Sequence, residues 1–275
     1  MALQRTLANL DTFAQRHLNL DICIQRVGRT IPGREEVPIY GRRGRIGAII
    51  PANNSVIEPE WWSVMPADVA VYATRILARG DLTPEAIHRM EEHVDQAVDE
   101  LAATGVDVIA YCDMVSTFIM ETDWNESKVA EIEKRTRARA LSAWTALRDA
   151  LSMLNVRRFA LGTPYPRAVH ALAAPFFAER GYEIVDQATL DIVKMNDVPT
   201  VSANRLLPFV TGLRRDRAEA IVLLATDLPT FESIATMEQT LGIPVLTSNQ
   251  TILWRALRSA KCNDPIPSLG KIFHA

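Results

Sequence analysis

From Arg45 onward, short apolar runs alternate with longer segments in which apolar residues recur at helical spacing. The apolar runs lie at 46–50, 69–73, 106–111, 159–162, 183–185, 220–225 and 244–247. The helical segments lie at 83–104, 125–154, 166–180, 199–214, 229–241 and 249–260. Strands that alternate with helices form βαβ units, whose parallel sheet is buried on both faces. The sequence therefore predicts an α/β fold built on parallel sheets.

One of these helices has signals at both ends. Thr83 and Pro84 provide an N-cap hydroxyl and a proline in the first turn, and both favour a helix start. Gly105 follows the segment 83–104, and glycine is the common residue just past a helix C-terminus. These signals predict a single helix from 83 to 104.

The alternation is duplicated along the chain. The stretch RIGAIIPANN (45–54) is similar to RFALGTPYP (158–166), because each is a strand that runs into a proline-marked polar loop. DVIAYCDMVSTF (107–118) and AIVLLATDLPTF (220–231) share an apolar strand, a short polar loop and a Thr-Phe pair. We therefore expect two pseudo-symmetric lobes, each a parallel sheet flanked by helices.

The expected lobes are discontinuous in sequence. The segment 249–260 is predicted to pack back on the first lobe, which then comprises 44–155 plus 249–275, while the second comprises 156–248. Residues 1–43 show helical spacing followed by a loop rich in glycine and proline, and predict an N-terminal helical extension. Such an extension often contacts another subunit, so a homo-oligomer is expected. The Trp61–Trp62 pair belongs either to such a contact or to the core.

Composition excludes several classes of protein. The net charge is −3, from 30 basic and 33 acidic side chains, without the basic stripe of a nucleic-acid-binding domain. The sequence contains no run of about 20 apolar residues, so no membrane span is expected. The N-terminus lacks the apolar core of a signal peptide. The three cysteines have no disulfide or zinc spacing, which favours a reducing cytoplasm.

The candidate ligand site follows from the predicted topology. Parallel sheets bind ligands beyond the carboxyl ends of their strands, and loops from two facing lobes would line one cleft. Those loops are rich in neutral hydrogen-bond donors, which suit a small carboxylate or a developing enolate. Their polar residues are Asn53, Asn54, Ser55, Cys112, Asp113, Ser116, Thr117, Thr163, Tyr165, Thr226, Asp227, Thr230, Ser248 and Asn249.

Each candidate in these loops has a structural alternative. Cys112 near a helix start could be a thiolate nucleophile, or a buried residue that ends a strand. Asp113 could be a general base, or only the N-cap of the next helix. Tyr165 could donate to a substrate oxygen or pack its ring on the sheet, and Asn54 could bind a carboxylate or hold its own loop. Spacing alone leaves these alternatives open.

Signals for cofactors and metals are absent from the sequence. GRRGRIG (41–47) precedes a strand, whereas a dinucleotide-binding glycine motif must follow one. The chain has no GxxxxGK[ST] phosphate loop, and its five histidines form no ligand cluster. We expect neither a cofactor nor a metal.

Several segments resemble the aspartate/glutamate racemase superfamily, most closely its maleate isomerase and arylmalonate decarboxylase branch. These segments are RIGAIIPANNSVIEPEWW (45–62), DVIAYCDMVSTF (107–118), VRRFALGTPYP (156–166), AIVLLATDLPT (220–230) and LGIPVLTSNQTILWRALR (241–258). The resemblance implies two pseudo-symmetric α/β lobes with the active site between them. It also implies that Asn54 and Tyr165 bind a substrate carboxylate, and less securely that Asn196 does.

The chain departs from this family at the two cysteine positions. Members usually carry one cysteine in each lobe, and an ungapped alignment places Asp113, not Cys112, at the first position. A one-residue shift restores Cys112. At the second position Ala225 replaces cysteine in the segment Ala-Thr-Asp-Leu, and Asp227 follows two residues later. Alanine cannot transfer a proton, so a two-cysteine mechanism is excluded. Asp227 is either a second active carboxylate or a helix cap.

The leading hypothesis is a cofactor-independent isomerase or decarboxylase-like lyase that acts on a small mono- or dicarboxylic acid through an enediolate-like or covalent intermediate. Asn54, Asn196, Ser116, Thr117 and Thr226 are expected to bind the substrate. Cys112, Asp113, Tyr165 and Asp227 are expected to be catalytic. The alternatives are a hydrolase in which Asp113 and Asp227 activate water, and a small-acid binding protein without activity.

Overall fold

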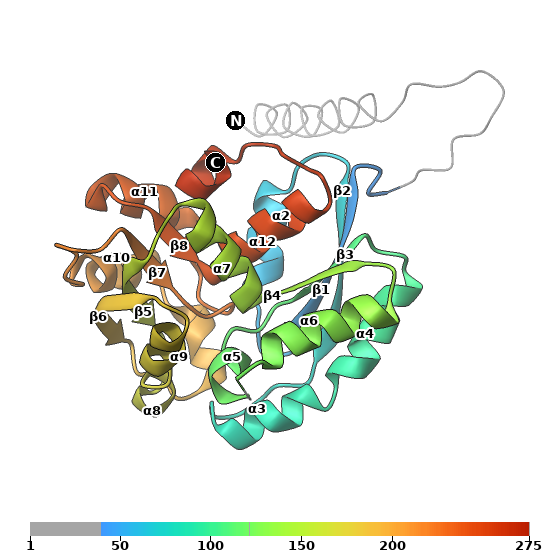
Figure 1. Ribbon diagram of the computed structural model, residues 1–275, viewed down its shortest axis with the longest axis horizontal. Coiled ribbons are helices and arrows are strands. Elements are labelled where there is room, and N and C mark those ends of the chain that lie inside the picture. Colours follow the sequence, from blue (N-terminus) through green and yellow to red (C-terminus); the bar gives the residue numbers. More distant parts are fainter. Residues whose placement is uncertain (1–39, 121, 275) are drawn as a thin grey trace, which may run out of the picture. The chain divides into compact units, whose positions relative to one another are not determined.

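Two four-stranded parallel sheets form the framework of the chain (Figure 1). The computed structural model describes residues 40–120 and 122–274. The first sheet contains β1 (Gly44–Pro51), β2 (Val69–Ile76), β3 (Val108–Tyr111) and β4 (Arg139–Ser142), in the order β2-β1-β3-β4. The second contains β5 (Arg158–Thr163), β6 (Glu183–Thr189), β7 (Ala220–Leu223) and β8 (Val245–Thr247), in the order β6-β5-β7-β8. The two sheets repeat the same order, and the predicted two-lobed α/β fold is confirmed.

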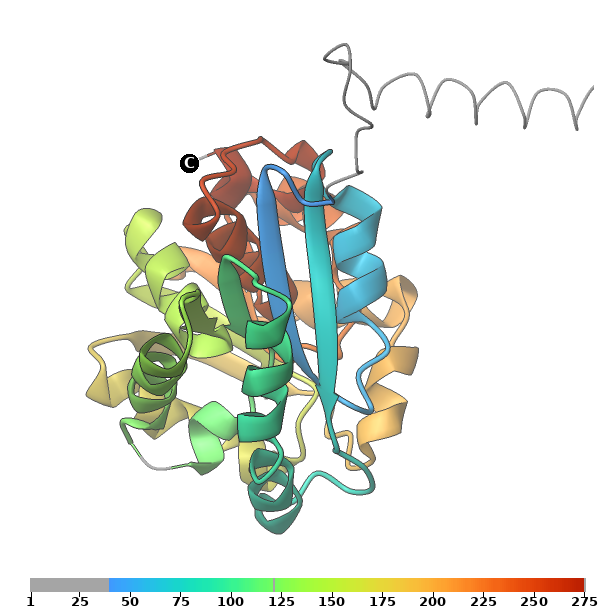
Figure 2. The same cartoon turned by 90° about the vertical axis from the view of Figure 1, so that its right-hand side faces the viewer.

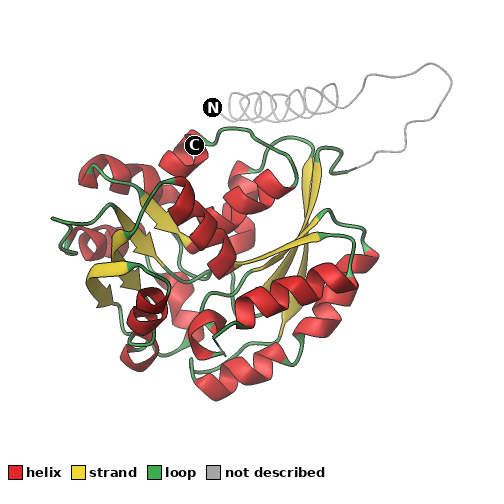
Figure 3. Cartoon of the chain, viewed as in Figure 1, coloured by secondary structure: helices red, strands yellow, loops and turns green. Residues whose placement is uncertain are grey.

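Helices connect and flank the strands (Figure 3). The part of the chain up to the second sheet contains α2 (Ile57–Val64), α3 (Pro84–Glu91), α4 (Val94–Ala103), α5 (Ser116–Ile119), α6 (Trp124–Arg135) and α7 (Ala143–Met153). The remainder contains α8 (Arg167–His170), α9 (Ala173–Glu179), α10 (Ala203–Thr211), α11 (Phe231–Leu241) and α12 (Ser248–Ser259). Three short 3-10 helices complete the described residues: η1 (Met195–Thr200), η2 (Pro267–Leu269) and η3 (Lys271–His274).

Helices cover both faces of the first sheet, as the apolar strands require. A side chain added at Gly47 would meet Leu101 of α4, whereas one added at Gly44 would meet Ala260 just after α12. Successive strand residues point to opposite faces, so residues three apart do too. Helix α4 therefore lies on one face of β1 and the end of α12 on the other, as Figure 2 shows.

Helices α7 and α12 join the two sheets. They pack against each other, α7 contacts β4 and β8, and α12 contacts β1, β3, β4 and β8. Figure 1 shows both helices between the sheets. The chain thus returns to the first sheet after the second is complete. The lobe boundaries expected at 155/156 and 248/249 stay a prediction. Residues 1–39 of the expected N-terminal extension lie outside the described residues.

Three helix predictions are wrong in detail. The segment 166–180 is divided into α8 and α9 by a turn at 171–172. The segment 125–154 contains β4, a short strand that pairs only with β3 and lies in a charged stretch without a strand pattern of its own. The segment 83–104 is two helices separated by a turn at 92–93. Helix α3 contacts α5, whereas α4 contacts β1 and β2. Buried positions keep helical spacing across the turn, so the sequence conceals the break.

The predicted ends of this segment are correct. The Thr83 hydroxyl accepts a hydrogen bond from the Ala86 amide at 3.2 Å, with Pro84 in the first turn. Gly105 has φ +67°, a left-handed conformation that other residues adopt at a cost.

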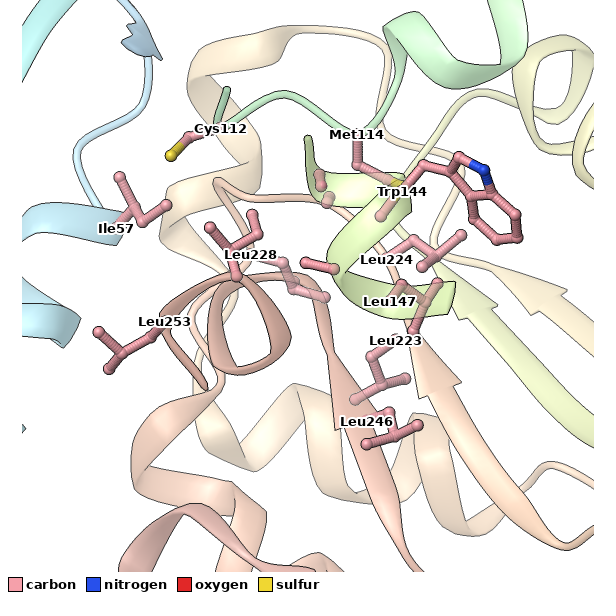
Figure 4. Close-up of a cluster of buried hydrophobic side chains, with 14 of the residues drawn as sticks. Ile57, Cys112, Met114, Trp144, Leu147, Leu223, Leu224, Leu228, Leu246 and Leu253 are labelled. Atoms are coloured by element: carbon pink, nitrogen blue, oxygen red, sulfur yellow. The ribbon is translucent and has the colours of Figure 1, made fainter. Parts of the chain in front are cut away.

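A single buried hydrophobic cluster runs through both halves of the fold. Figure 4 shows part of it, where Met114 and Leu147 lie close to Leu224 and Leu223 from the end of the second sheet. Trp61 belongs to this core at 1% exposure, whereas the neighbouring Trp62 is 55% exposed. Because the lobes share a core, the loops at their strand ends are held in a fixed relative position. Among the described residues, no helix is both long and apolar enough to span a bilayer.

Candidate active site

A cavity lies where the carboxyl ends of strands from both sheets meet. The space between its walls that atoms do not fill is about 480 Å³, including the part that is open to solvent. Its walls come from the loops after β1, β2, β3, β5, β6 and β7 and from α3 and η1. The lining residues are Pro51, Asn53, Asn54, Ala78, Leu82, Ile87, Met90, Asp113, Met114, Val115, Tyr165, Ile192, Met195, Val198, Ala225, Thr226 and Asp227. This is the edge at which open parallel sheets bind ligands.

Asp113 contributes a buried carboxyl group from the first lobe. It follows β3, and only 6% of the residue is exposed. Its Oδ1 accepts hydrogen bonds from the backbone amide and the hydroxyl of Ser116, both at 2.7 Å. Burial raises the pKa of Asp113, while the hydrogen bonds from Ser116 act in the opposite direction. Asp113 therefore holds the start of α5 and also lines the cavity.

Asp227 contributes the matching carboxyl group from the second lobe. It lies just after β7, and Asn53 Nδ2 donates a hydrogen bond to its Oδ2 at 3.3 Å. Burial, and more weakly the charge of Asp113, raise the pKa of Asp227 to about 7. A carboxyl group with this pKa is protonated about half the time at neutral pH, and is suited to general acid catalysis.

The Asp113 carboxyl is connected to a second acidic side chain, Glu91, at the end of α3. Ser116 Oγ lies 2.7 Å from Glu91 Oε1 and 2.7 Å from Asp113 Oδ1. Tyr111 also donates a hydrogen bond to Glu91 Oε1. Glu91 Oε2 is buried and has no partner within residues 40–120 and 122–274. One serine hydroxyl has one proton, so it cannot donate to two carboxylates at once. At least one of the two carboxyl groups must therefore be protonated.

The pKa of Glu91 agrees with this arrangement. Burial, and more weakly the charge of Asp113, raise it to about 7, although Tyr111, Ser116 and Lys128 favour the ionised form. No sequence motif marks Glu91 as a site residue. The available signal is its position one residue after buried Met90, on a helix that precedes the loop of Asp113.

Tyr165 places an unused hydroxyl at the cavity. The residue is 4% exposed and its hydroxyl has no hydrogen-bond partner among the described residues. Its ring packs edge-on against Phe118, with centroids 6.4 Å apart. Burial, followed by the charges of Asp113 and Asp227, raises the pKa of Tyr165 well above its usual value. The hydroxyl thus stays protonated and available to donate to a ligand oxygen.

Asn54 and its neighbour tie the two lobes together beside the cavity. Asn54 Oδ1 accepts from the amides of Val56 and Ile57 at 2.9 and 3.1 Å, which holds the start of α2. Its Nδ2 donates to Thr226 Oγ1 at 3.2 Å. These bonds leave Asn54 one N–H for a ligand. With the bond from Asn53 to Asp227, they join the loop after β1 to the loop after β7.

Ala225 occupies a strained backbone position in the second-lobe loop. Its φ is 105°, a backbone conformation that residues other than glycine rarely adopt. Its amide donates a hydrogen bond to Ser248 Oγ at 3.1 Å. Strain of this kind concentrates at functional sites, because the surrounding structure must enforce it. Here it sets the direction of Thr226 and Asp227, the two residues that follow.

Cys112 lies outside the cavity wall. It has no exposed surface, its thiol donates to the Ala110 carbonyl at 3.4 Å, and Figure 4 shows it in the apolar cluster beside Ile57. Burial, followed by the charges of Asp113 and Glu58, raises the pKa of the Cys112 thiol well above its usual value. The thiol is therefore protonated and enclosed, and it is Asp113 that lines the cavity.

Three further predicted site residues are not on the cavity wall. Asn196 is exposed on η1, whose neighbouring residue Met195 lines the cavity instead. Ser116 contacts Asp113 and Glu91, and Thr117 donates to Asn125 Oδ1 at 3.4 Å. The cavity brings together Asn54, Asp113, Tyr165, Thr226 and Asp227. Within the described ranges, no group of three or more His, Cys, Asp or Glu side chains is placed to hold a metal ion.

The fold and this cavity define a two-lobed α/β protein with a site shared by the ends of both sheets, and comparison with known proteins gives its family. The arylmalonate decarboxylase family model matches residues 46–273. The chain is 25% identical over 241 residues to the maleate isomerase of Geobacillus stearothermophilus, covering 83% of this chain and 96% of that protein. It is 25% identical over 231 residues to the arylmalonate decarboxylase of Bordetella bronchiseptica, covering 83% and 95%.

Solved structures agree with the sequence comparison. The maleate cis-trans isomerase of Nocardia farcinica matches with a TM-score of 0.78 at 25% identity, covering 84% of this chain and 97% of that one. The chain belongs to the arylmalonate decarboxylase family. The resemblance stated from the sequence is confirmed, and so is the expected class, an isomerase- or lyase-type enzyme like the maleate isomerases and arylmalonate decarboxylase.

Proposed function

We propose that this protein is an isomerase that moves a proton at the carbon next to the carboxyl group of a small acid. The observation that carries this proposal is the pair Asp113 and Asp227, one from each lobe, facing one cavity. The two carboxyl groups differ in their hydrogen bonds, which suits one to be the base and the other the acid.

In the proposed reaction Asp113 is the base. Two donors from Ser116 favour its carboxylate form, which removes the proton from the substrate carbon. The electrons of the broken C–H bond move toward the carboxyl group and form an enediolate. Asp227 then returns a proton to carbon from the other lobe. The reaction conserves electrons and needs no cofactor.

The hydroxyl groups at the cavity support the enediolate. Tyr165 has a free O–H, and Thr226 lies beside Asp227 at the end of β7. Donors fixed in a site from which water is excluded stabilise a developing oxyanion strongly, because they need no reorganisation during the reaction. The names of the relatives, maleate isomerase and arylmalonate decarboxylase, support a small carboxylic acid as substrate.

Decarboxylation is the second candidate reaction. The apolar part of the wall, including Met114, Val115 and Ile192, favours it, because a carboxylate held there is poorly solvated. Its loss as CO2 passes the electrons of the broken C–C bond to a second carboxyl group of the substrate, which becomes an enediolate. Asp227 would then protonate the carbon. Neither reaction uses a thiol, since Ala225 has none and Cys112 is enclosed in the core.

Solvent deuterium exchange tests the proposal. A panel of small acids with a hydrogen on the carbon next to the carboxyl group is incubated in D2O, and NMR measures deuterium at that carbon, the isomer formed and any CO2 loss. We expect Asp227→Asn to lower exchange by about 100-fold, the typical contribution of a general acid. Cys112→Ala is the control and should exchange within about 3-fold of wild type. Full exchange in Asp227→Asn, or its loss in a folded Cys112→Ala, would contradict the assignment.

Two further expectations accompany the proposal. A homo-oligomer and a cytoplasmic location stay predictions from the sequence. Light scattering of the purified full chain measures the oligomeric state.

A further inference from the structure

Helix α11 begins directly after the loop of Asp227, and its first amides are held by a side chain from the other half of the fold. We infer that this side chain, Glu60 of α2, is a positioning residue that keeps Asp227 directed into the cavity. The inference deepens the proposed function and rests on it, because Asp227 is the acid of that reaction.

Glu60 binds the start of α11 with one carboxylate oxygen and the start of α12 with the other. Its Oε1 accepts hydrogen bonds from the backbone amides of Thr230 and Phe231, at 2.5 and 2.8 Å. Its Oε2 accepts a hydrogen bond from Asn249 Nδ2 at 2.6 Å. One carboxyl group from the first lobe therefore connects α2 with two helices that begin after strands of the second sheet.

Glu60 takes the place of the N-cap side chain that α11 lacks. The first amides of a helix need acceptors, which the side chain at the N-cap position usually supplies. Thr230 occupies that position, but its hydroxyl donates to Thr247 Oγ1 at 3.2 Å and caps no amide of α11. A carboxylate at this place also faces the positive end of the helix dipole. Burial raises the pKa of Glu60, whereas the bonds from Phe231, Thr230 and Asn249 favour its ionised form.

This arrangement leaves Asp227 without a capping role. In the first lobe, Asp113 holds the start of its own helix through the Ser116 amide. In the second lobe Glu60 holds the start of α11, and within the described residues the Asp227 side chain makes no hydrogen bond to that helix. Asp227 is thus not the cap of α11, and its carboxyl group is left to line the cavity.

The position of Asp227 depends on the two ends of its loop. At the first end the Ala225 amide is bound to α12, and at the second end Glu60 holds Thr230. Between these ends the Asp227 carboxyl receives one hydrogen bond from another side chain, the 3.3 Å bond from Asn53. We expect that loss of Glu60 releases the second end of the loop and lets the Asp227 carboxyl reach water.

An NMR titration of the Asp227 carboxyl tests this role without any substrate. The full chain is labelled with carbon-13 at its aspartate carboxyl groups, and the Asp227 signal is the one that Asp227→Asn removes. Burial above all raises the pKa of Asp227 to about 7 in the wild type. In Glu60→Ala we expect this pKa to fall to about 6 or below, because a carboxyl group that reaches water loses the effect of burial. An unchanged pKa in folded Glu60→Ala overturns the inference.

Two further variants separate position from charge. Glu60→Asp keeps the charge but is one methylene too short to hold α11 and α12 together, so the pKa of Asp227 should fall here too, by a smaller amount. Glu232→Gln removes an exposed acid from the first turn of the same helix and should leave the pKa of Asp227 at about 7. Equal effects of the Glu60 and Glu232 variants would overturn the inference. If Glu60→Ala does not fold, Glu60→Asp decides, and an unchanged pKa there rejects the role of Glu60.

Deuterium exchange connects this role with the proposed reaction. Glu60→Ala should lower exchange about 10-fold, because a displaced acid is less effective. In the Asp227→Asn background the same change should cost less than about 2-fold, since no acid is left to position. Equal losses in the two backgrounds contradict a role that acts through Asp227.

The two proposals fail in different ways. If the wild type exchanges no deuterium into any of the acids, the proposed reaction is refuted, and the NMR titration still decides the role of Glu60. If exchange requires Asp227 but the Glu60 variants leave its pKa and the exchange rate unchanged, the reaction stands and the role of Glu60 is refuted.

Discussion

The loops after β3 and β7 are equivalent in the two halves of the fold, yet they hold their carboxyl groups differently. Asp113 receives two hydrogen bonds at 2.7 Å from Ser116, and Ser116 connects it to Glu91. Asp227 has one longer side-chain bond, at 3.3 Å from Asn53. Pseudo-symmetry therefore places two acids at one cavity, and the local contacts make them unequal.

This inequality has a chemical consequence. Strong donors stabilise a carboxylate, whereas burial without them stabilises the protonated acid. Asp113 is thus prepared to accept a proton, and Asp227, with a pKa of about 7, to give one. A thiol pair would need two cysteines at the cavity, but the second lobe has Ala225 and the first has Asp113 there.

The largest expected effect comes from removing the base. Asp113→Asn should lower the rate of deuterium exchange by about 1,000-fold or more, compared with about 100-fold for Asp227→Asn, because water can replace an acid more easily than a positioned base. Single-turnover exchange measurements on both variants provide the comparison. Equal losses would show that the two loops are functionally symmetric, and a larger loss in Asp227→Asn would reverse the assigned roles.

The sequence predicts the position of the site better than its chemistry. Strand ends and loops locate Asn54, Tyr165 and Asp227, because parallel topology brings those ends together. The sequence could not show whether Cys112 or Asp113 faces the cavity, because a shift of one residue at a strand end moves a side chain to the opposite face. Only the structure places Asp113 at the cavity and Cys112 in the core.

Two other features of the site could not be predicted from the sequence, for physical reasons. Glu91 is linked to Asp113 through Ser116, at a contact between α3 and the start of α5, and such tertiary contacts leave no local sequence pattern. The family resemblance implies that Asn196 binds the substrate, but Asn196 is exposed on η1 and the neighbouring Met195 lines the cavity. Side-chain direction in a short 3-10 helix depends on where the helix starts, which a sequence pattern defines poorly.

A smaller effect on the exchange rate should distinguish the contribution of Glu91, which contacts Asp113 through Ser116, from that of Asp113 and Asp227 themselves. Glu91 acts through Ser116, so it is a positioning residue, and the groups that face it are Tyr111, Ser116, Asp113 and Lys128. Glu91→Gln removes a titrating group and leaves the Ser116 proton free for Asp113. We expect exchange to fall about 10-fold and the acidic limb of the pH–rate profile to move to lower pH, because Asp113 becomes easier to ionise.

The adjacent residue provides a control for this experiment. Glu92 is exposed, and Glu92→Gln should change neither the rate nor the profile. A rate loss in Glu91→Gln without any movement of the pH profile would mean that Glu91 only supports the fold, and that Asp113 works without Glu91.

The smallest effect concerns stability, and it compares the two acids directly. Asp227 has a pKa of about 7 in the folded protein, above the ordinary value of 3.8 for an aspartate. A raised folded pKa contributes stability that is complete below about pH 4 and is lost as pH rises through about 7. Asp227→Asn removes this titration. The variant should therefore gain about 2 kcal/mol on the wild type between pH 4 and pH 8, after allowance for partial exposure.

Urea unfolding at several pH values between 4 and 8 measures this difference. The difference in stability between Asp113→Asn and the wild type should change less with pH, because the bonds from Ser116 oppose the effect of burial on the pKa of Asp113. If the difference in stability from the wild type depends on pH equally in the two variants, the two carboxyl groups are held equally. The functional asymmetry between the lobes would then have to come from the substrate, because it would not be built into the loops.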